Sequence, residues 1–164
     1  MMPRSIGERR SKMEPQAPDV LAMVHLIMLS LWGGVVATEA VIELLPFRRR
    51  ELHPAAVRFH YWIDLLVELP LVLAVVATGT VLALSLDELS GLHWIKIVLG
   101  STAVAVNLFC IAVVVRRGRR LDHEGAPEDL WNASRVVLAC FAFGLMAAAG
   151  AATLGFRFAL ERVG

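Results

Sequence analysis

Residues 55–84 read AAVRFHYWIDLLVELPLVLAVVATGTVLAL, and this stretch decides the fold. A helix needs roughly 20 mostly apolar residues to cross a bilayer, and this stretch exceeds that length. It nevertheless carries His60, Asp64 and Glu68, which follow one another at four-residue spacing. Residues at that spacing lie on one face of a helix. The stretch therefore predicts a membrane helix with one polar face.

Three further apolar stretches, on both sides of the first, also predict membrane helices: residues 20–45, 92–115 and 133–160. The polar connections between them are short, and short connections make consecutive helices antiparallel. We therefore expect an all-α, integral membrane, up-down four-helix bundle with both termini at one end. A polar tail, residues 1–18, precedes this single domain of residues 19–164.

The composition supports a membrane protein and excludes a nucleic-acid-binding one. Hydrophobic residues make up 57% of the chain, and the mean hydropathy is +0.65. A chain of this size cannot hide that much apolar surface in one soluble core, so the lipid bilayer is the expected partner. With 16 basic and 15 acidic residues the net charge is only +1, which is not the strongly basic balance typical of nucleic-acid-binding proteins.

Positive charges concentrate at one end of the expected bundle, which we call the arginine-rich end. It carries Arg48, Arg49, Arg50, Arg58, Arg116, Arg117, Arg119 and Arg120. The opposite connection, near Asp87 and Glu88, has neither Arg nor Lys. The positive-inside rule predicts that the arginine-rich end is cytoplasmic and that both termini are outside, although the basic tail acts against this. The preference for Arg over Lys indicates a bacterial source, and hence the bacterial inner membrane.

Two helices carry carboxylates at depths where charges are costly. Glu39 and Glu43 belong to the first helix, and His60, Asp64 and Glu68 belong to the second. Measured from the arginine-rich end at about 1.5 Å per residue, Glu39 lies ~10 Å deep and Asp64 ~15 Å deep. Because the two helices are antiparallel neighbours, their polar faces are expected to meet. Carboxylates inside a membrane tend to face a partner, a cavity or an ion.

This set of four carboxylates and one imidazole predicts a site for a divalent transition metal, used in transport or redox chemistry. The donor set is similar in type to the metal sites of helical bundles, although the Glu-x-x-His motif of di-iron proteins is absent. Hard carboxylates favour iron, manganese or zinc over copper. Two alternatives stay open. In the first, some of the acids are protonated or form ion pairs with Arg58, with His60 or with each other, and these pairs only stabilise the bundle. In the second, the acids form a proton pathway.

Pro70 predicts an interruption of the second helix beside this group. Proline has no N–H group, so it cannot bond to the carbonyl of Leu66 four residues earlier. A kink and a free acceptor are therefore expected next to Glu68.

A second polar group is expected at the other end of the bundle, formed by His25, His93, Lys96 and Arg157. Two histidines on different helices are suitable axial ligands of a b-type haem, with the two cations near its propionates. The protein would then be an electron-transfer subunit. The alternative is that these residues anchor helix ends at the lipid headgroups.

The fourth helix carries small residues at four-residue spacing on two adjoining stripes: Ala147, Ala151 and Gly155, and Gly144, Ala148 and Ala152. Small residues at this spacing allow helices to approach closely. We expect them to pack within the bundle, and a homo-oligomer through this helix is the alternative.

The run HLIMLSLWGG, residues 25–34, resembles the opening of small bacterial four-helix membrane proteins of the copper-resistance CopD-like and cytochrome b561-like group. Ala77-Thr78-Gly79, followed by the run WIKI at residues 94–97, resembles a later stretch of the same group. The resemblance implies a four-helix membrane fold with histidine-bound copper or haem, and it carries over only His25 as a candidate ligand. The carboxylates of the first two helices are not part of that pattern.

No nucleophile with a neighbouring base, phosphate-binding loop or dinucleotide fingerprint is found in the sequence, so nothing indicates an enzyme of the soluble type. Three hypotheses follow from the sequence. They are a membrane metalloprotein, a haem-containing electron-transfer subunit, and a structural or assembly protein of the membrane.

Overall fold

The computed structural model describes residues 17–86, 88–124 and 129–163, and the side chains of residues 20–86, 88–121, 131–151 and 153. Every regular element in these ranges is helical. In chain order the elements are α2 (Ala17–Arg48), η1 (Arg50–Leu52), α3 (His53–Ile63), η2 (Asp64–Glu68), α4 (Leu69–Leu84), α5 (Gly91–Glu124) and α6 (Asp129–Val163). Because α3, η2 and α4 follow one another without a break, they form one rod.

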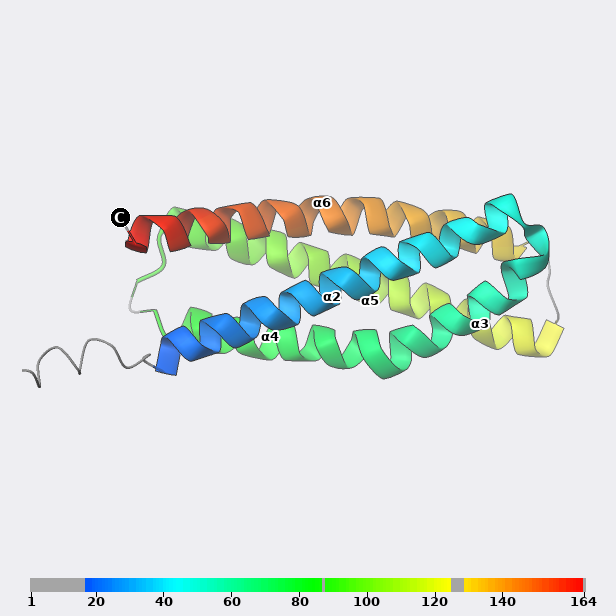
Figure 1. Cartoon of the computed structure of the whole chain (residues 1–164), viewed down its shortest axis with the longest axis horizontal. Helices are drawn as coiled ribbons and strands as arrows, with labels where there is room; N and C mark the ends of the chain where they lie inside the picture. The colour runs from blue at the N-terminus through cyan, green and yellow to red at the C-terminus, as the bar shows by residue number, and fades with distance from the viewer. Residues whose placement is uncertain (1–16, 87, 125–128, 164) are drawn as a thin grey trace, which may run out of the picture.

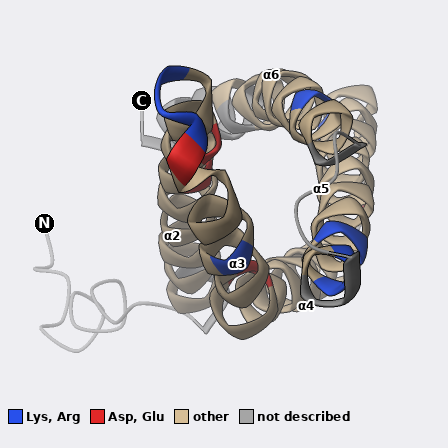
Figure 2. Ribbon diagram, turned by 90° about the vertical axis from the view of Figure 1, so that its right-hand side faces the viewer, with Lys and Arg blue, Asp and Glu red and all other residues tan. Residues whose placement is uncertain are grey.

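The helices form four antiparallel rods side by side, and the start of α2 and the end of α6 lie at the same end (Figure 1). The second rod packs between α2 and α5, and α6 closes the ring by packing against α5 and α2. Viewed along its axis, the bundle is a ring in which α2 and α5 are diagonal (Figure 2). The predicted all-α four-helix bundle is confirmed.

All four rods contain segments long and apolar enough to cross a membrane: Val20–Arg48, Arg50–Leu84, Gly91–Leu121 and Trp131–Ala151. Large apolar side chains cover the outside of the bundle. Leu66 and Met146, for example, are 66% and 67% exposed. Charged groups lie inside, where Glu39 and Asp64 are both 0% exposed. This inverted distribution is the one expected of an integral membrane protein.

The third helix extends further than predicted. Its apolar stretch ends at residue 115, but α5 continues to Glu124. Arginine is a good helix former, and no proline or glycine pair interrupts residues 116–124. The extension places Arg117 on a helix inside the bundle instead of in a loop, and its side chain is only 2% exposed.

Small residues of α6 pack within the bundle, as expected. Ala147 belongs to the buried core together with Trp32 and Val72, and Ala148 packs against that core. The side chain of Ala152 and the surroundings of Gly155 lie outside what the structure describes. Homo-oligomerisation through α6 stays a prediction.

The interruption expected at Pro70 takes the form of a π turn. Residues Asp64–Glu68 form η2, in which the N–H group of Leu69 donates to the carbonyl of Asp64, five residues earlier. Pro70 follows immediately in the first turn of α4. A π turn inserts an extra residue into a helix and is frequent at functional sites. Here both of its ends, Asp64 and Glu68, are buried.

Candidate metal centre

Three potential metal ligands converge in the interior of the bundle. Glu39 comes from α2, His60 from α3 and Asp64 from the start of η2, and each is 0% exposed. Each contributes one ligand atom, and these atoms all lie within 4.8 Å of one another. The two polar helix faces predicted from the sequence therefore meet, and they form a buried histidine and carboxylate group that could hold a metal ion.

The atoms that face one another in this group lack hydrogen bonds to the described residues. Nε2 of His60 lies 3.2 Å from Oδ1 of Asp64 and 3.9 Å from Oε2 of Glu39. These two distances are those of ion pairs with His60, but neither contact has hydrogen-bond geometry, and none of the four carboxylate oxygens has a hydrogen-bond partner among the described residues. A buried polar atom without a partner costs about 1–3 kcal/mol, and more when it is charged. A cation between the three side chains would give each of them one partner.

His60 is oriented for metal binding by Glu43. Nδ1 of His60 lies 2.9 Å from Oε2 of Glu43, so the N–H group of the ring is placed on Nδ1 and donates to this carboxylate. That tautomer directs the lone pair of Nε2 toward Glu39 and Asp64. Metal-binding histidines are commonly held by a carboxylate in this way.

Glu43 is in turn fixed by Arg117 of α5. Nη1 and Nη2 of Arg117 donate to the two carboxylate oxygens of Glu43, at 2.5 and 2.9 Å. Such a two-point contact orients the plane of the carboxylate and stabilises its ionised form. Nη1 also donates to Oγ of Ser134 on α6, at 2.9 Å. Three rods of the bundle therefore position the imidazole of His60.

The polar chain continues toward the arginine-rich end. Oγ of Ser134 lies 3.2 Å from Nε2 of His53, the first residue of α3. The His53 ring stacks on Trp131, with the ring centroids 4.5 Å apart, and Arg50 lies over the same indole. These contacts join the start of α6 to the connection between α2 and α3.

Glu68 lies beside the three-residue group and has partners of its own. Its Oε1 accepts hydrogen bonds from Nε1 of Trp32 at 3.2 Å and from Nδ2 of Asn107 at 2.6 Å. The structure thus brings all five predicted residues into one interior region. Three of them have unpaired atoms that face one another, whereas Glu43 and Glu68 are held by neighbouring side chains.

The ion pairs expected from the sequence between His60 and the acids are present, with Nδ1 2.9 Å from Glu43 and Nε2 3.2 Å from Asp64. Arg58 is exposed, and the structure adds a pair that the sequence did not predict, between Glu43 and the buried Arg117. The neighbouring Arg116 is exposed, whereas Arg117 continues the helix face of Asn107, Cys110 and Val114, at spacings of three and four residues, which are all buried. Arg117 is directed into the bundle because α5 continues as a helix past residue 115.

The charges in the interior also favour a cation. Among the described residues, the carboxyl groups of Glu39, Glu43, Asp64 and Glu68 are buried, and the guanidinium of Arg117 is buried with them and pairs with Glu43. Charges that are close together in a low-dielectric interior interact strongly. A divalent cation would therefore stabilise the ionised form of the acids that have no guanidinium partner.

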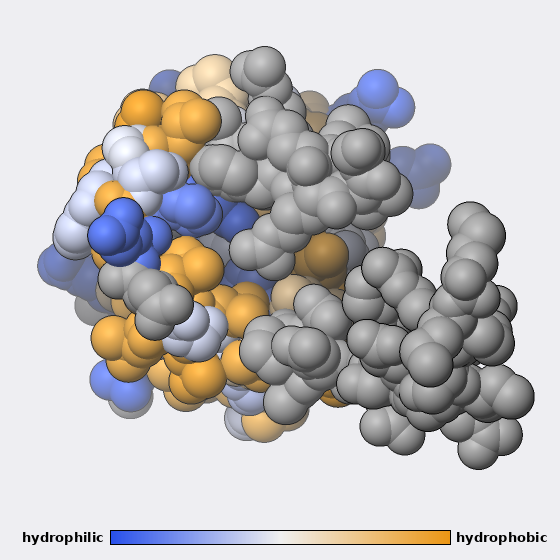
Figure 3. All heavy atoms as spheres, turned by 90° about the vertical axis from the view of Figure 1, so that its left-hand side faces the viewer, coloured by the Kyte–Doolittle hydropathy of each residue, from blue (hydrophilic) through white to orange (hydrophobic). Residues whose placement is uncertain are grey.

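The second predicted group lies at the opposite end of the bundle, where hydrophilic residues are interspersed among apolar ones on the described surface (Figure 3). Nδ1 of His25 pairs with Oγ1 of Thr78 at 2.8 Å, and the His25 ring lies directly against Gly79. Nδ1 of His93 pairs with Oγ of Ser90 at 2.7 Å. The two histidines belong to diagonal helices, α2 and α5. The side chain of the fourth member, Arg157, lies outside the described residues.

Comparison with models of protein families, with curated proteins and with solved structures finds no match to this chain. Membership of the CopD-like and cytochrome b561-like group therefore stays a prediction.

Proposed function

We propose that this protein is an integral membrane metalloprotein that binds a divalent transition metal ion through Glu39, His60 and Asp64. The observation that carries the proposal is the convergence of three fully buried side chains whose facing atoms have no hydrogen-bond partners. One nitrogen and two carboxylate donors suit iron, manganese or zinc better than copper.

The number of ligands indicates how the ion is used. Structural zinc sites are usually closed by four protein ligands, whereas sites that act on a substrate keep a position open. A three-residue site leaves such a position, which favours transport of the ion or redox chemistry over a purely structural role. Glu43 and Arg117 would keep the imidazole of His60 in its metal-binding tautomer.

We further propose that the protein lies in the bacterial inner membrane with both termini outside. The supporting observation is the set of exposed arginines at one end of the bundle: Arg48, Arg49, Arg50, Arg58, Arg116 and Arg119 (Figure 2). Positive charges of this kind are retained on the cytoplasmic side.

Metal analysis of the purified full-length protein tests the proposal. The variants Glu39→Gln and Asp64→Asn each remove one ligand with little change in shape, and Glu88→Gln serves as the matched control because Glu88 is exposed. We expect about one equivalent of iron, manganese or zinc in the wild type and in the control. We expect both ligand variants to lose the metal while they keep the helical circular dichroism spectrum.

Equal metal content in all four proteins would contradict the metal site. It would favour the hypothesis that the interior acids only stabilise a structural or assembly protein.

Haem binding at the other end is the second candidate. Because Thr78 occupies Nδ1 of His25, Nε2 of that ring is left as a ligand atom of the kind haem iron uses. A visible absorption spectrum of the same preparation, from cells supplied with haem, provides the test. A Soret band that is lost in a His25→Ala variant would support the haem hypothesis, and a colourless protein would contradict it.

A further inference from the structure

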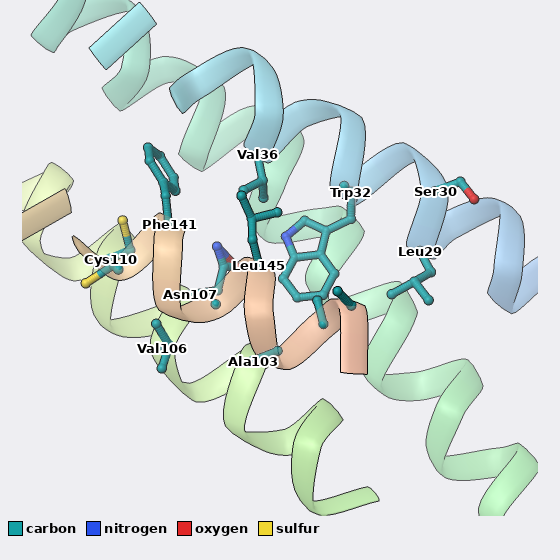
Figure 4. Close-up of a pocket in the computed structure, with 15 residues that line it drawn as sticks. Leu29, Ser30, Trp32, Val36, Ala103, Val106, Asn107, Cys110, Phe141 and Leu145 are labelled. Atoms are coloured by element: carbon teal, nitrogen blue, oxygen red, sulfur yellow. The ribbon is translucent and has the colours of Figure 1, made fainter. Parts of the chain in front are cut away.

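Two free cysteines lie on neighbouring helices of the bundle, and neither belongs to the proposed metal site. Cys110 of α5 is 3% exposed, and Cys140 of α6 is half-buried. The two side chains contact each other as hydrogen-bond partners. Both also line a cleft of about 330 Å³ beside Trp32, between α2, α5 and α6 (Figure 4).

Contacts on both sides of the cysteines show how α5 and α6 are aligned. On one side, a Cβ atom added at Gly144 of α6 would lie 3.7 Å from Cγ1 of Val106 of α5. On the other side, Nη1 of Arg117 of α5 donates to Oγ of Ser134 of α6 at 2.9 Å. Between these two contacts the chain advances 11 residues along α5 and goes back 10 residues along α6. The two helices are therefore antiparallel and keep one register through this region.

The cysteines occupy matching positions in this register. Cys110 follows Val106 by four residues, and Cys140 precedes Gly144 by four residues. Four residues are about one helical turn, so both thiols lie one turn further along the faces at which the helices meet. Glycine at residue 144 allows a close approach of the two backbones. A disulfide needs Cβ atoms about 3.5–4.5 Å apart, and cysteines that face each other across closely packed helices are placed to form one.

The surroundings favour a disulfide over a metal ion bound by the two sulfur atoms. Metal ions bind thiolates, and two thiolates would add negative charge to the interior that holds the carboxyl groups of Glu39, Asp64 and Glu68. A disulfide carries no charge. It would fit the hydrophobic core to which Cys110 belongs and against which Cys140 packs.

The cleft determines which thiol an oxidant reaches first. Its lining residues Ser30, Leu145 and Ala149 are exposed, and they lie within segments long and apolar enough to span the membrane. A small uncharged oxidant can therefore enter from the bilayer. Cys140 is the less buried of the two cysteines, so it is the first to react, and Cys110 is the second.

From these observations we propose that Cys110 and Cys140 form a reversible disulfide, which joins α5 to α6 within the membrane when a peroxide oxidises the pair. Hydrogen peroxide converts the thiol of Cys140 to a sulfenic acid and is reduced to water. The sulfur of Cys110 then attacks the sulfenic sulfur, so that the S–S bond forms, the S–O bond breaks and a second water leaves. A dithiol reductant returns both thiols and becomes a cyclic disulfide. The proposal is independent of the metal site.

Intact-mass spectrometry of the full-length protein tests the proposal, because these are the only two cysteines in the chain. The protein, in phosphatidylcholine vesicles and a buffer with a chelator, is treated with hydrogen peroxide. It is then denatured in acid and alkylated with N-ethylmaleimide. We expect the wild type to lose two hydrogen atoms and to take up no maleimide. After dithiothreitol we expect it to take up two.

Two variants make the test specific. The double variant Ala139→Cys, Cys140→Ala keeps the composition but moves one thiol to an exposed neighbouring position. We expect it to keep both thiols free after the same treatment, with an unchanged helical circular dichroism spectrum. Cys110→Ala removes the second thiol, and we expect the sulfenic acid on Cys140 to persist and to be trapped by dimedone.

Three results would overturn the proposal. Two free thiols in the peroxide-treated wild type would mean that the cysteines only fill the core. A dimer on a non-reducing gel would mean that Cys140 reacts between two copies of the chain. Equal disulfide formation in the double variant would mean that the alignment of α5 and α6 does not select the pair.

Discussion

His60 shows how one side chain connects the two parts of the interior. Its Nδ1 lies against Glu43, which is paired with Arg117. Its Nε2 faces Glu39 and Asp64 without a hydrogen bond. The two nitrogens thus have different roles, because one is occupied by a fixed carboxylate and the other is left for a ligand.

Arg117 is expected to stabilise the folded bundle strongly. Removing one partner of a buried ion pair leaves the other charge without compensation, at a cost of about 3–5 kcal/mol. We expect Arg117→Gln to lower the free energy of unfolding by this amount in a detergent titration. We expect Arg116→Gln, at the exposed neighbouring position, to have little effect.

A double-mutant cycle with Glu43→Gln checks the origin of this loss. Because the two residues contact each other, the double variant should lose less stability than the sum of the single variants. Additive losses would show that Arg117 does not act through Glu43.

Glu43 is expected to tune metal affinity without binding the ion. Partners that orient a metal ligand typically change affinity by about 10- to 100-fold. We therefore expect Glu43→Gln to weaken metal binding by that factor in a competition assay with a chelating dye, while Glu39→Gln abolishes binding. Glu51→Gln is the control, since Glu51 is exposed at the same end of the bundle. Complete loss of metal in Glu43→Gln would instead make Glu43 a ligand.

At the scale of the elements, the π turn of η2 determines how the second rod presents its polar residues. The extra residue between Asp64 and Leu69 changes the phase of the helix. Both acids of the turn stay buried, and the inserted residue changes the direction in which the residues of α4 face relative to those of α3. The turn is maintained because Pro70 cannot form a regular hydrogen bond.

Replacing Pro70 tests this account. In Pro70→Ala an N–H group becomes available to the carbonyl of Leu66, so the regular helix is expected to return and to shift Glu68 and α4 relative to His60 and Asp64. We expect weaker metal binding with helix content preserved. Pro54→Ala, in the first turn of α3, is the control because proline is tolerated there. Unchanged affinity in Pro70→Ala would mean that the π turn does not position the site.

The packing of α3 on α5 depends on Gly118, next to Arg117. A Cβ atom at this position would lie 2.7 Å from Cδ2 of Tyr61. We expect Gly118→Ala to cost about 1–3 kcal/mol of unfolding free energy, because the two helices must move apart. Gly100→Ala on the same helix is the control, since an added Cβ there meets no atom within 4 Å. The midpoint of denaturation in mixed micelles gives the comparison, and equal midpoints would contradict the expectation.

At the scale of the whole molecule, the bundle has an apolar exterior and a charged interior. The exposed arginines gather at one end of it (Figure 2). The interior site lies among the rods, with Arg117, Ser134 and His53 between it and that end. The proposed orientation would direct this polar chain toward the cytoplasm.

Cysteine labelling checks the orientation. In a background in which Cys110 and Cys140 are replaced by alanine, Glu88→Cys and Arg50→Cys place single thiols at opposite ends of the bundle. We expect a membrane-impermeant maleimide to label the first in intact cells and the second only after the membrane is opened. The reverse pattern would invert the topology, and the unsubstituted alanine background controls for labelling of other groups.

The sequence by itself determined the four helices, their antiparallel order and the polar faces of the first two. These features depend on apolar length and on four-residue spacing, which are local properties of the chain. For the same reason the sequence placed Glu39, His60 and Asp64 together, since neighbouring antiparallel helices with polar faces must bring them into contact.

Only the tertiary structure decided which of these groups are paired and which are left for a ligand. Arg117 and Asn107 come from α5, far from the acids in sequence, and their contacts depend on the rotation of that helix in the bundle. Arg117 binds Glu43, and Asn107 binds Glu68. The cleft beside Trp32 likewise exists only where three helices meet. Such contacts depend on helix phase and on the fit between rods, which no local pattern of residues encodes.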